Sequence, residues 1–162
     1  MGRGRRPVVG RAAGREVASS DVREDEALSA TPVERAETAV MFLRTEADPG
    51  TMQRGWERLE AATRLRGRKF FGAFYPTTGE YRVCAELREG DDAAALGLES
   101  GTLPGGRYLR TRLRGEPPEV YERIGPIFEE LAQQARPDET RPSIEFYRRR
   151  DEIDLLLPVA TH

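Results

Sequence analysis

The sequence predicts an α+β fold in which two strand-helix-strand-strand units pair about a pseudo-two-fold axis and leave a central cleft. Segments with strand and helix periodicity follow in the same order in both halves, and the halves align when the chain is shifted against itself by 72 positions. Size is the third observation behind this prediction. Each unit has about 60 residues or fewer, too few to bury a sufficient core alone, so the two should pair.

Composition fits one globular domain. The 162 residues include 26 Lys and Arg against 28 Asp and Glu, and the net charge of -2 gives no electrostatic reason to expect nucleic acid or a membrane as a partner. No apolar run approaches the roughly 18 residues of a transmembrane helix, and the Arg-rich start lacks the apolar segment of a secretory signal, so we expect a cytoplasmic protein. With one cysteine, Cys84, and one histidine, His162, we expect no disulfide, no metal and no cofactor.

Residues 1–30 differ from the rest and are predicted to form a disordered tail. Five arginines fall in the first fifteen positions, acidic residues follow between Asp21 and Glu26, and no apolar periodicity runs through the segment. A basic arm that grips phosphates is the alternative interpretation. The domain is expected over residues 31–160, with repeat 1 at about 31–90 and repeat 2 at about 103–159.

Repeat 1 opens with a predicted strand in "VERAETAVMFLRTEA", which leads into a helix. Asp48 is a suitable N-cap with Pro49 in the first helical position, and Met52, Trp56 and Leu59 recur at helical spacing. A hairpin follows in "KFFGAFYPTTGEYRVCAEL", where "PTTGE" separates two strand-like runs.

Repeat 2 has the same order: a strand in "GRYLRTRLRG", a helix in "PPEVYERIGPIFEELAQQ" and two strands in "SIEFYRRRDEIDLLLPV". Pro126 predicts a kink or a late start of that helix. The charged segment "LREGDDAAALGLESG" between the repeats is interpreted as a solvated linker.

The repeats differ at one informative position. The shift of 72 sets Phe74 on Phe146 and places Ala73 opposite Glu145, so a methyl group stands where the other half has a carboxylate. If both phenylalanines point at the helices, strand alternation turns Glu145 and Tyr147 away from the helices, towards a cleft or towards water. Enclosure by aromatic rings would raise the pKa of Glu145 unless a cation compensates it, which favours a flat, lipophilic cation as ligand.

Three pieces of the sequence together resemble a known family. The strand "LPGGRYLRTRLRG", the "IEFY" strand after a proline-opened helix, and the closing "EIDLLLPV" resemble the GyrI-like small-molecule-binding domain over about residues 31–159. This family includes the effector module of multidrug-responsive activators. The resemblance implies a duplicated fold whose pocket, between the halves, binds lipophilic cations through an acidic residue of the Glu-x-Tyr strand. The predicted ligand-binding residues are Glu145, Tyr147, Tyr75, Trp56, Phe42 and Tyr108.

The resemblance leaves three functions open. The 30 residues ahead of the domain are too short and polar for a helix-turn-helix domain, so we expect a stand-alone module without direct DNA binding. The leading hypothesis is binding and sequestration of lipophilic, aromatic, often cationic small molecules. The alternatives are a hydrolase of cyclopropane-type DNA-alkylating natural products that uses Glu145 and Tyr147, and a modulator of DNA gyrase. For the last, "LREGDDAAALGLESG" is the candidate contact surface.

Overall fold

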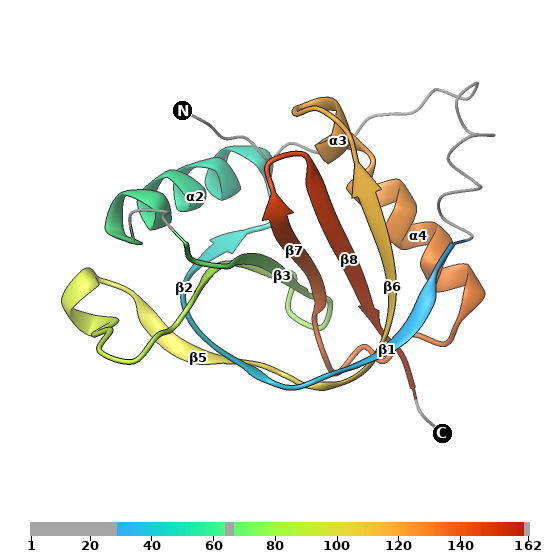
Figure 1. The fold of residues 1–162 in the computed structure, drawn as a ribbon, viewed down its shortest axis with the longest axis horizontal. Helices are drawn as coiled ribbons and strands as arrows, with labels where there is room; N and C mark the ends of the chain where they lie inside the picture. Colours follow the sequence, from blue (N-terminus) through green and yellow to red (C-terminus); the bar gives the residue numbers. More distant parts are fainter. Residues whose placement is uncertain (1–28, 64–66, 161–162) are drawn as a thin grey trace.

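The computed structural model describes residues 29–63 and 67–160, which form a curled antiparallel sheet, a half-barrel, with helices packed on one of its faces (Figure 1). The sheet has eight strands in the order β1-β6-β8-β7-β3-β4-β2-β5. The strands are β1 (Thr31–Arg35), β2 (Thr38–Glu46), β3 (Phe70–Tyr75), β4 (Glu80–Glu86), β5 (Glu99–Leu103), β6 (Gly106–Arg114), β7 (Ser143–Arg149) and β8 (Glu152–Pro158). The helices are α2 (Pro49–Thr63), α3 (Glu119–Glu122) and α4 (Ile124–Gln134). The fold is therefore mixed α+β, as predicted.

The order strand, helix, strand, strand is present in both halves, as β2-α2-β3-β4 and as β6-α3-α4-β7-β8. In the sheet, β7 and β3 are neighbours, and the strands on either side follow in matching order out to β1 and β5. The duplication and its pseudo-two-fold axis stay predictions. The predicted tail, residues 1–30, lies outside the described residues except for Ser29 and Ala30.

The segment predicted as a linker holds more structure than expected. It contains the short 3-10 turn Ala94–Leu96 and the first residues of β5, which pairs with the outer side of β2. Ala93 and Leu98 are buried against the α2 side of the sheet, so the segment anchors itself by burying apolar side chains despite its charge.

Local signals explain where the helices begin. Asp48 caps α2, because its carboxylate accepts hydrogen bonds from the Thr51 amide at 2.9 Å and the Thr51 hydroxyl at 2.7 Å. These bonds lower the pKa of Asp48. Pro126 falls in the first turn of α4, where its missing N–H has no helical partner to lose, which agrees with the predicted late start.

The core occupies both faces of the sheet. On the helix face, α2 packs on β2 and β4 around Trp56 and Leu59, and α4 packs on β8 around Ile127 and Leu131. On the inner face, inside the curl, side chains from both edges and the centre of the sheet meet in one cluster. In the part of the chain that the structure describes, no helix is long and apolar enough to cross a membrane.

The strand faces differ from the prediction in one respect. Phe74 packs with the α2 cluster on the helix face, as expected, whereas Phe146 packs with the inner-face cluster. The two phenylalanines are therefore not equivalent. Residues that the shift of 72 aligns therefore lie on opposite faces of β3 and β7, so the alignment is out of phase in these strands.

Candidate functional site

A cavity of about 540 Å³ opens on the helix face between α2 and α4, above the central strands of the sheet. We call it the helix-face pocket. Most of its wall is aromatic or aliphatic, with Met52, Phe74, Tyr81, Tyr121, Ile124, Phe128 and Tyr147 among its lining residues. Its volume is typical of a small-molecule site, for which roughly 300–1,000 Å³ is usual.

Glu145 is the polar centre of this pocket. One carboxylate oxygen, Oε1, accepts hydrogen bonds from the Tyr81 hydroxyl at 2.7 Å and from the Tyr147 hydroxyl at 2.5 Å. Hydrogen bonds to an ionised acceptor are short and strong, so the two tyrosines fix the direction of the carboxylate. Tyr147 stands on the same face of β7 two residues along, while Tyr81 reaches Glu145 from β4, across β3.

Gly72 makes the hydrogen bond from Tyr81 possible. It lies on β3 directly opposite Glu145, and a Cβ atom at this position would come within 1.9 Å of the Tyr81 hydroxyl oxygen and 2.6 Å of Glu145 Oε1. Real contacts of a Cβ atom are never this short. The missing side chain of Gly72 is therefore the space in which the phenol of Tyr81 lies, an example of glycine in a strand marking a close approach.

Aromatic rings hold Tyr147 in place. Its ring meets the Trp56 ring edge to face, with centroids 5.3 Å apart, and meets the Tyr121 ring in a similar way at 6.3 Å. Trp56 is only 3% exposed and lies in the α2 core outside the lining of the pocket. The structure thus places Trp56 behind Tyr147, where it supports the pocket wall.

The other three predicted residues lie on the opposite face of the sheet. Phe42, Tyr75 and Tyr108 pack in or against the inner-face cluster, and none lines the helix-face pocket. The reason is strand alternation: on β2, β3 and β6 these positions have the parity that turns the side chain away from the helices. Of the six predicted residues, only Glu145 and Tyr147 are brought together in the helix-face pocket.

Sequence reasoning missed Tyr81 and Tyr121. Tyr81 follows the hairpin turn and alternates with Val83 and Ala85 on the helix face, a pattern visible in "EYRVCA". Gly72 inside a strand was the signal for a close neighbour on that face. Tyr121 comes from the short helix α3, whose position over Tyr147 depends on tertiary packing that no local pattern encodes.

The rim of the pocket is acidic. Glu129, Asp138 and Glu139 join Glu145 in the lining, against one guanidinium, that of Arg141. Arg141 is itself paired with Asp138 at 2.9 Å. Hydrogen bonds from Thr140 and Arg141 lower the pKa of Asp138 to about 2, so this carboxylate is ionised. The excess of carboxylates favours a positively charged ligand.

The described residues give little support for a metal site or for a reactive cysteine. Among residues 29–63 and 67–160, no three His, Cys, Asp or Glu side chains are grouped to hold a metal ion. Burial raises the pKa of the Cys84 thiol to about 12, which disfavours the thiolate needed for nucleophilic catalysis.

Comparison with known proteins identifies relatives of this fold. The sequence profile of the GyrI-like small molecule binding domain matches residues 31–160. Comparison with curated protein sequences gave no match.

Three solved structures illustrate the likeness. An integron cassette protein from the mobile metagenome of Vibrio cholerae has 18% sequence identity and a TM-score of 0.61, over 81% of this chain and 95% of that one. SAV2435, solved with bound tetraphenylphosphonium, has 16% identity and a TM-score of 0.54, over 82% and 94%. A hydrolase from Listeria innocua has 11% identity and a TM-score of 0.54, over 85% and 97%. At these identities the likeness establishes the fold alone.

Proposed function

Since the chain belongs to the GyrI-like small molecule binding domain family, we propose that it binds lipophilic, aromatic, often cationic small molecules in the helix-face pocket. The biological role that follows is multidrug binding and sequestration. One observation carries the proposal: a carboxylate, Glu145, is held by two tyrosine hydroxyls inside a cavity whose wall is largely aromatic.

The chemistry of the wall supports a cation of this kind. Partial desolvation makes the carboxylate of Glu145 a strong partner for a positive charge. The rings of Phe74, Tyr121 and Phe128 offer flat surfaces, and each cation–π contact adds about 0.5–2 kcal/mol. The structural neighbour SAV2435 was solved with tetraphenylphosphonium, a lipophilic cation, which agrees with this choice of ligand class.

The same pocket wall is suited to ligands of different shape. Apart from Glu145 and its tyrosines, the deep lining consists of side chains that bind by contact area and impose few directional demands. Met52 is flexible and polarizable, so it adapts to ligands of different shape. A pocket with one fixed charge and adaptable walls is expected to bind many related cations with moderate affinity.

Hydrolysis is the second candidate, and the Glu145–Tyr147 hydrogen bond favours it. A carboxylate and a phenol in contact at 2.5 Å can direct a water molecule and stabilise the charge that develops as a strained ring opens. One structural neighbour is described as a hydrolase. Incubation with a cyclopropane-containing alkylator, followed by product analysis, tests this candidate; unchanged compound at stoichiometric protein would eliminate it.

A titration with tetraphenylphosphonium tests the leading proposal. We expect saturable binding that Glu145→Gln weakens about tenfold or more, since loss of one close charge contact is worth at least about 1.4 kcal/mol. Glu57→Gln is the matched control, because Glu57 is an exposed carboxylate on α2 outside the pocket lining. The uncharged triphenylphosphine oxide should be much less sensitive to Glu145→Gln. Equal affinity of wild type and Glu145→Gln for the cation would refute the role of Glu145.

A further inference from the structure

The inner face of the sheet presents five arginines whose guanidinium groups lie over aromatic rings. They are Arg35 over Phe71 at 5.8 Å, Arg44 over Phe42 at 5.7 Å, Arg82 over Phe42 and Tyr75 at 4.4 Å each, Arg141 over Tyr108 at 4.9 Å and Arg148 over Phe146 at 5.9 Å. All five cover the aromatic cluster of this face, which makes them a natural set for comparison.

Four of the five have a carboxylate partner and one does not. The pairs are Arg44 with Glu99 at 2.9 Å, Arg82 with Glu80 at 2.5 Å, Arg141 with Asp138 at 2.9 Å and Arg148 with Glu152 at 2.9 Å. Arg35 donates one hydrogen bond, from Nη2 to the Thr38 hydroxyl at 2.8 Å, and no carboxylate of the described residues lies within ion-pair distance of it. Its Nε atom is buried without a hydrogen-bond partner. Burial also lowers the pKa of Arg35, as expected for an under-compensated charge.

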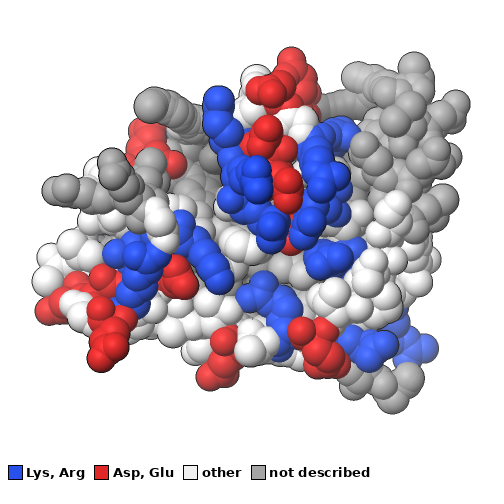
Figure 2. Space-filling view, in the orientation of Figure 1, with Lys and Arg blue, Asp and Glu red and all other residues white. Residues whose placement is uncertain are grey.

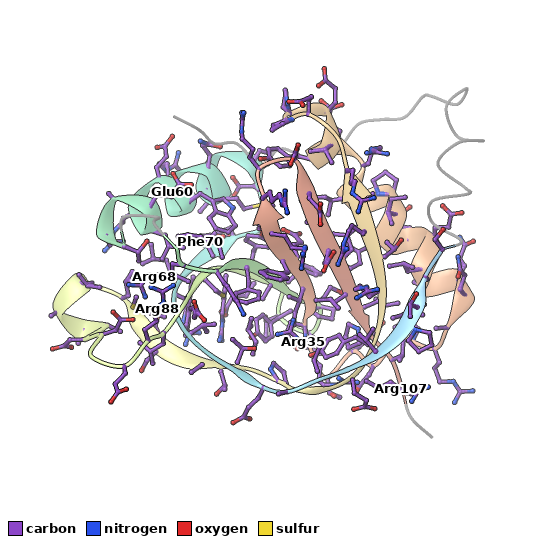
Figure 3. The ribbon with its side chains drawn as sticks, viewed as in Figure 1. Arg35, Glu60, Arg68, Phe70, Arg88 and Arg107 are labelled. Carbon is purple, nitrogen blue, oxygen red and sulfur yellow. The ribbon has the colours of Figure 1, made fainter. Side chains whose placement is uncertain are left out.

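Arg35 occupies a central place on this face. Cross-strand pairing sets Phe71, Phe146, Asp154 and Arg112 in one row across β3, β7, β8 and β6. The curl brings the Arg35 guanidinium from the edge strand β1 over this row, and Figure 3 shows it within the curve of the sheet. The Phe71 and Phe146 rings are stacked 5.0 Å apart, and the Arg148 guanidinium lies over the Phe146 ring at 5.9 Å, which leaves Phe146 partly exposed.

The surrounding charge is positive. Arg112 holds Asp154 with two hydrogen bonds, at 2.6 and 3.2 Å, and Glu152 is shared by Arg112, Arg114 and Arg148. In Figure 2 basic side chains gather on both sides of a line of carboxylates near the upper ends of β6, β7 and β8. Asp154, the carboxylate whose charge acts on Arg35, is therefore already hydrogen-bonded to Arg112, and an added anion would meet a favourable potential.

We propose that the inner face holds a second binding site, in which Arg35 receives the carboxylate of a small aromatic anion whose flat body lies against the exposed part of the Phe146 ring. A carboxylate matches the planar guanidinium and supplies the acceptor that Arg82 and Arg141 already have from the protein. This site is separated from the helix-face pocket by the sheet and selects the opposite charge. It does not depend on the function proposed for that pocket.

The test uses 2-naphthoate as the probe, followed by calorimetry and by the ¹⁵N NMR signal of the Arg35 Nε–H group. We expect saturable binding that shifts this signal, and at least tenfold weaker binding by Arg35→Gln. Arg107→Gln is the matched control, since Arg107 is an exposed arginine at the start of β6, labelled at the lower right of Figure 3. It should bind 2-naphthoate as wild type does, and excess tetraphenylphosphonium should not displace the probe.

Three outcomes would overturn the proposal. They are an Arg35 Nε–H signal that does not move at saturating 2-naphthoate, equal affinity of Arg35→Gln and wild type, and displacement of the probe by tetraphenylphosphonium, which would place it in the helix-face pocket. Because the NMR signal is observed in the wild-type protein, the test holds even if Arg35→Gln does not fold. Inorganic phosphate as a second probe should bind more weakly than 2-naphthoate, since it lacks a body to lie on Phe146.

Discussion

The two faces of the central strands β3 and β7 are built from neighbouring residues and have opposite chemistry. On the helix face, Glu145 and Tyr147 line an acidic, aromatic cavity between two separated helices. On the inner face, Ile144 and Phe146 join an aromatic cluster that arginines cover. On β7, Glu145 is therefore a carboxylate that accepts hydrogen bonds from two phenols, while the next residue, Phe146, is a ring beneath a guanidinium on the other face. The difference shows how strand alternation alone can give one small sheet two surfaces of opposite charge.

Adding a methyl group at Gly72 should break the helix face most severely. Gly72→Ala forces a Cβ atom against the Tyr81 hydroxyl and Glu145, so either the ring moves or the hydrogen bond is lost. We expect the free energy of unfolding to fall by about 3 kcal/mol, from overpacking together with a poorly satisfied carboxylate. Binding of tetraphenylphosphonium should be lost with it.

Gly50→Ala is the control for this prediction. Gly50 lies in the first turn of α2, where an added Cβ atom would meet only ordinary contacts at 3.6 and 3.7 Å. Chemical denaturation of both variants gives the comparison. Stability of Gly72→Ala within 0.5 kcal/mol of wild type, about the usual effect of a neutral surface change, would show that Tyr81 is not confined as described.

Removing single hydroxyl groups should distinguish the faces more finely. Tyr81→Phe and Tyr147→Phe each remove a donor to Glu145, and we expect each to lower the free energy of unfolding by about 1.5 kcal/mol, the scale of a hydrogen bond to a charged group. Tyr75→Phe on the inner face is the control, with an expected change below about 0.5 kcal/mol. A larger loss from Tyr75→Phe than from Tyr147→Phe would reverse the assignment of the faces.

The ion pair of Asp138 and Arg141 connects the faces, because Asp138 lines the helix-face pocket and Arg141 covers Tyr108 on the inner face. The pKa of Asp138 is lowered from 3.8 to about 2, first by the Thr140 hydroxyl and then by Arg141. A carboxyl group whose folded pKa is depressed contributes stability above its unfolded pKa and loses it as the pH falls through the folded value. We therefore expect a small loss of stability between about pH 4 and pH 2 that Asp138→Asn abolishes. Thermal unfolding across this range, with Glu139→Gln as control, measures it; parallel profiles for Asp138→Asn and wild type would contradict it.

The sequence was sufficient for most of the order of the elements and for the proximity of Glu145 and Tyr147. Helical stripes, the Asp48 cap and the strand-like runs are local signals, but the single strand predicted in "VERAETAVMFLRTEA" is two strands, β1 and β2, which lie towards opposite edges of the sheet. Strand faces were harder to predict. The shift of 72 aligns buried Leu59 with buried Leu131 in the helices. Continued without a gap into the strands, the same shift aligns Phe74 with Phe146 and so predicts that both lie on the same face of the sheet.

In the structure these two phenylalanines lie on opposite faces, because one residue more or less between helix and strand reverses every side chain that follows. The pair Glu145 and Tyr147 was thus identified correctly as neighbours, but expected to point away from the helices that enclose it. Tyr81 and Tyr121 could not be placed from sequence, because their contacts with Glu145 and Tyr147 join elements far apart in the chain.

A crystal structure of the protein with tetraphenylphosphonium would show whether the helix-face pocket is the cation site. We expect the cation between α2 and α4, with its phenyl rings against Tyr121 and Phe128 and its charge towards Glu145. A cation bound on the inner face against Phe42, Tyr75 and Tyr108, with the helix-face pocket empty, would refute the proposed site.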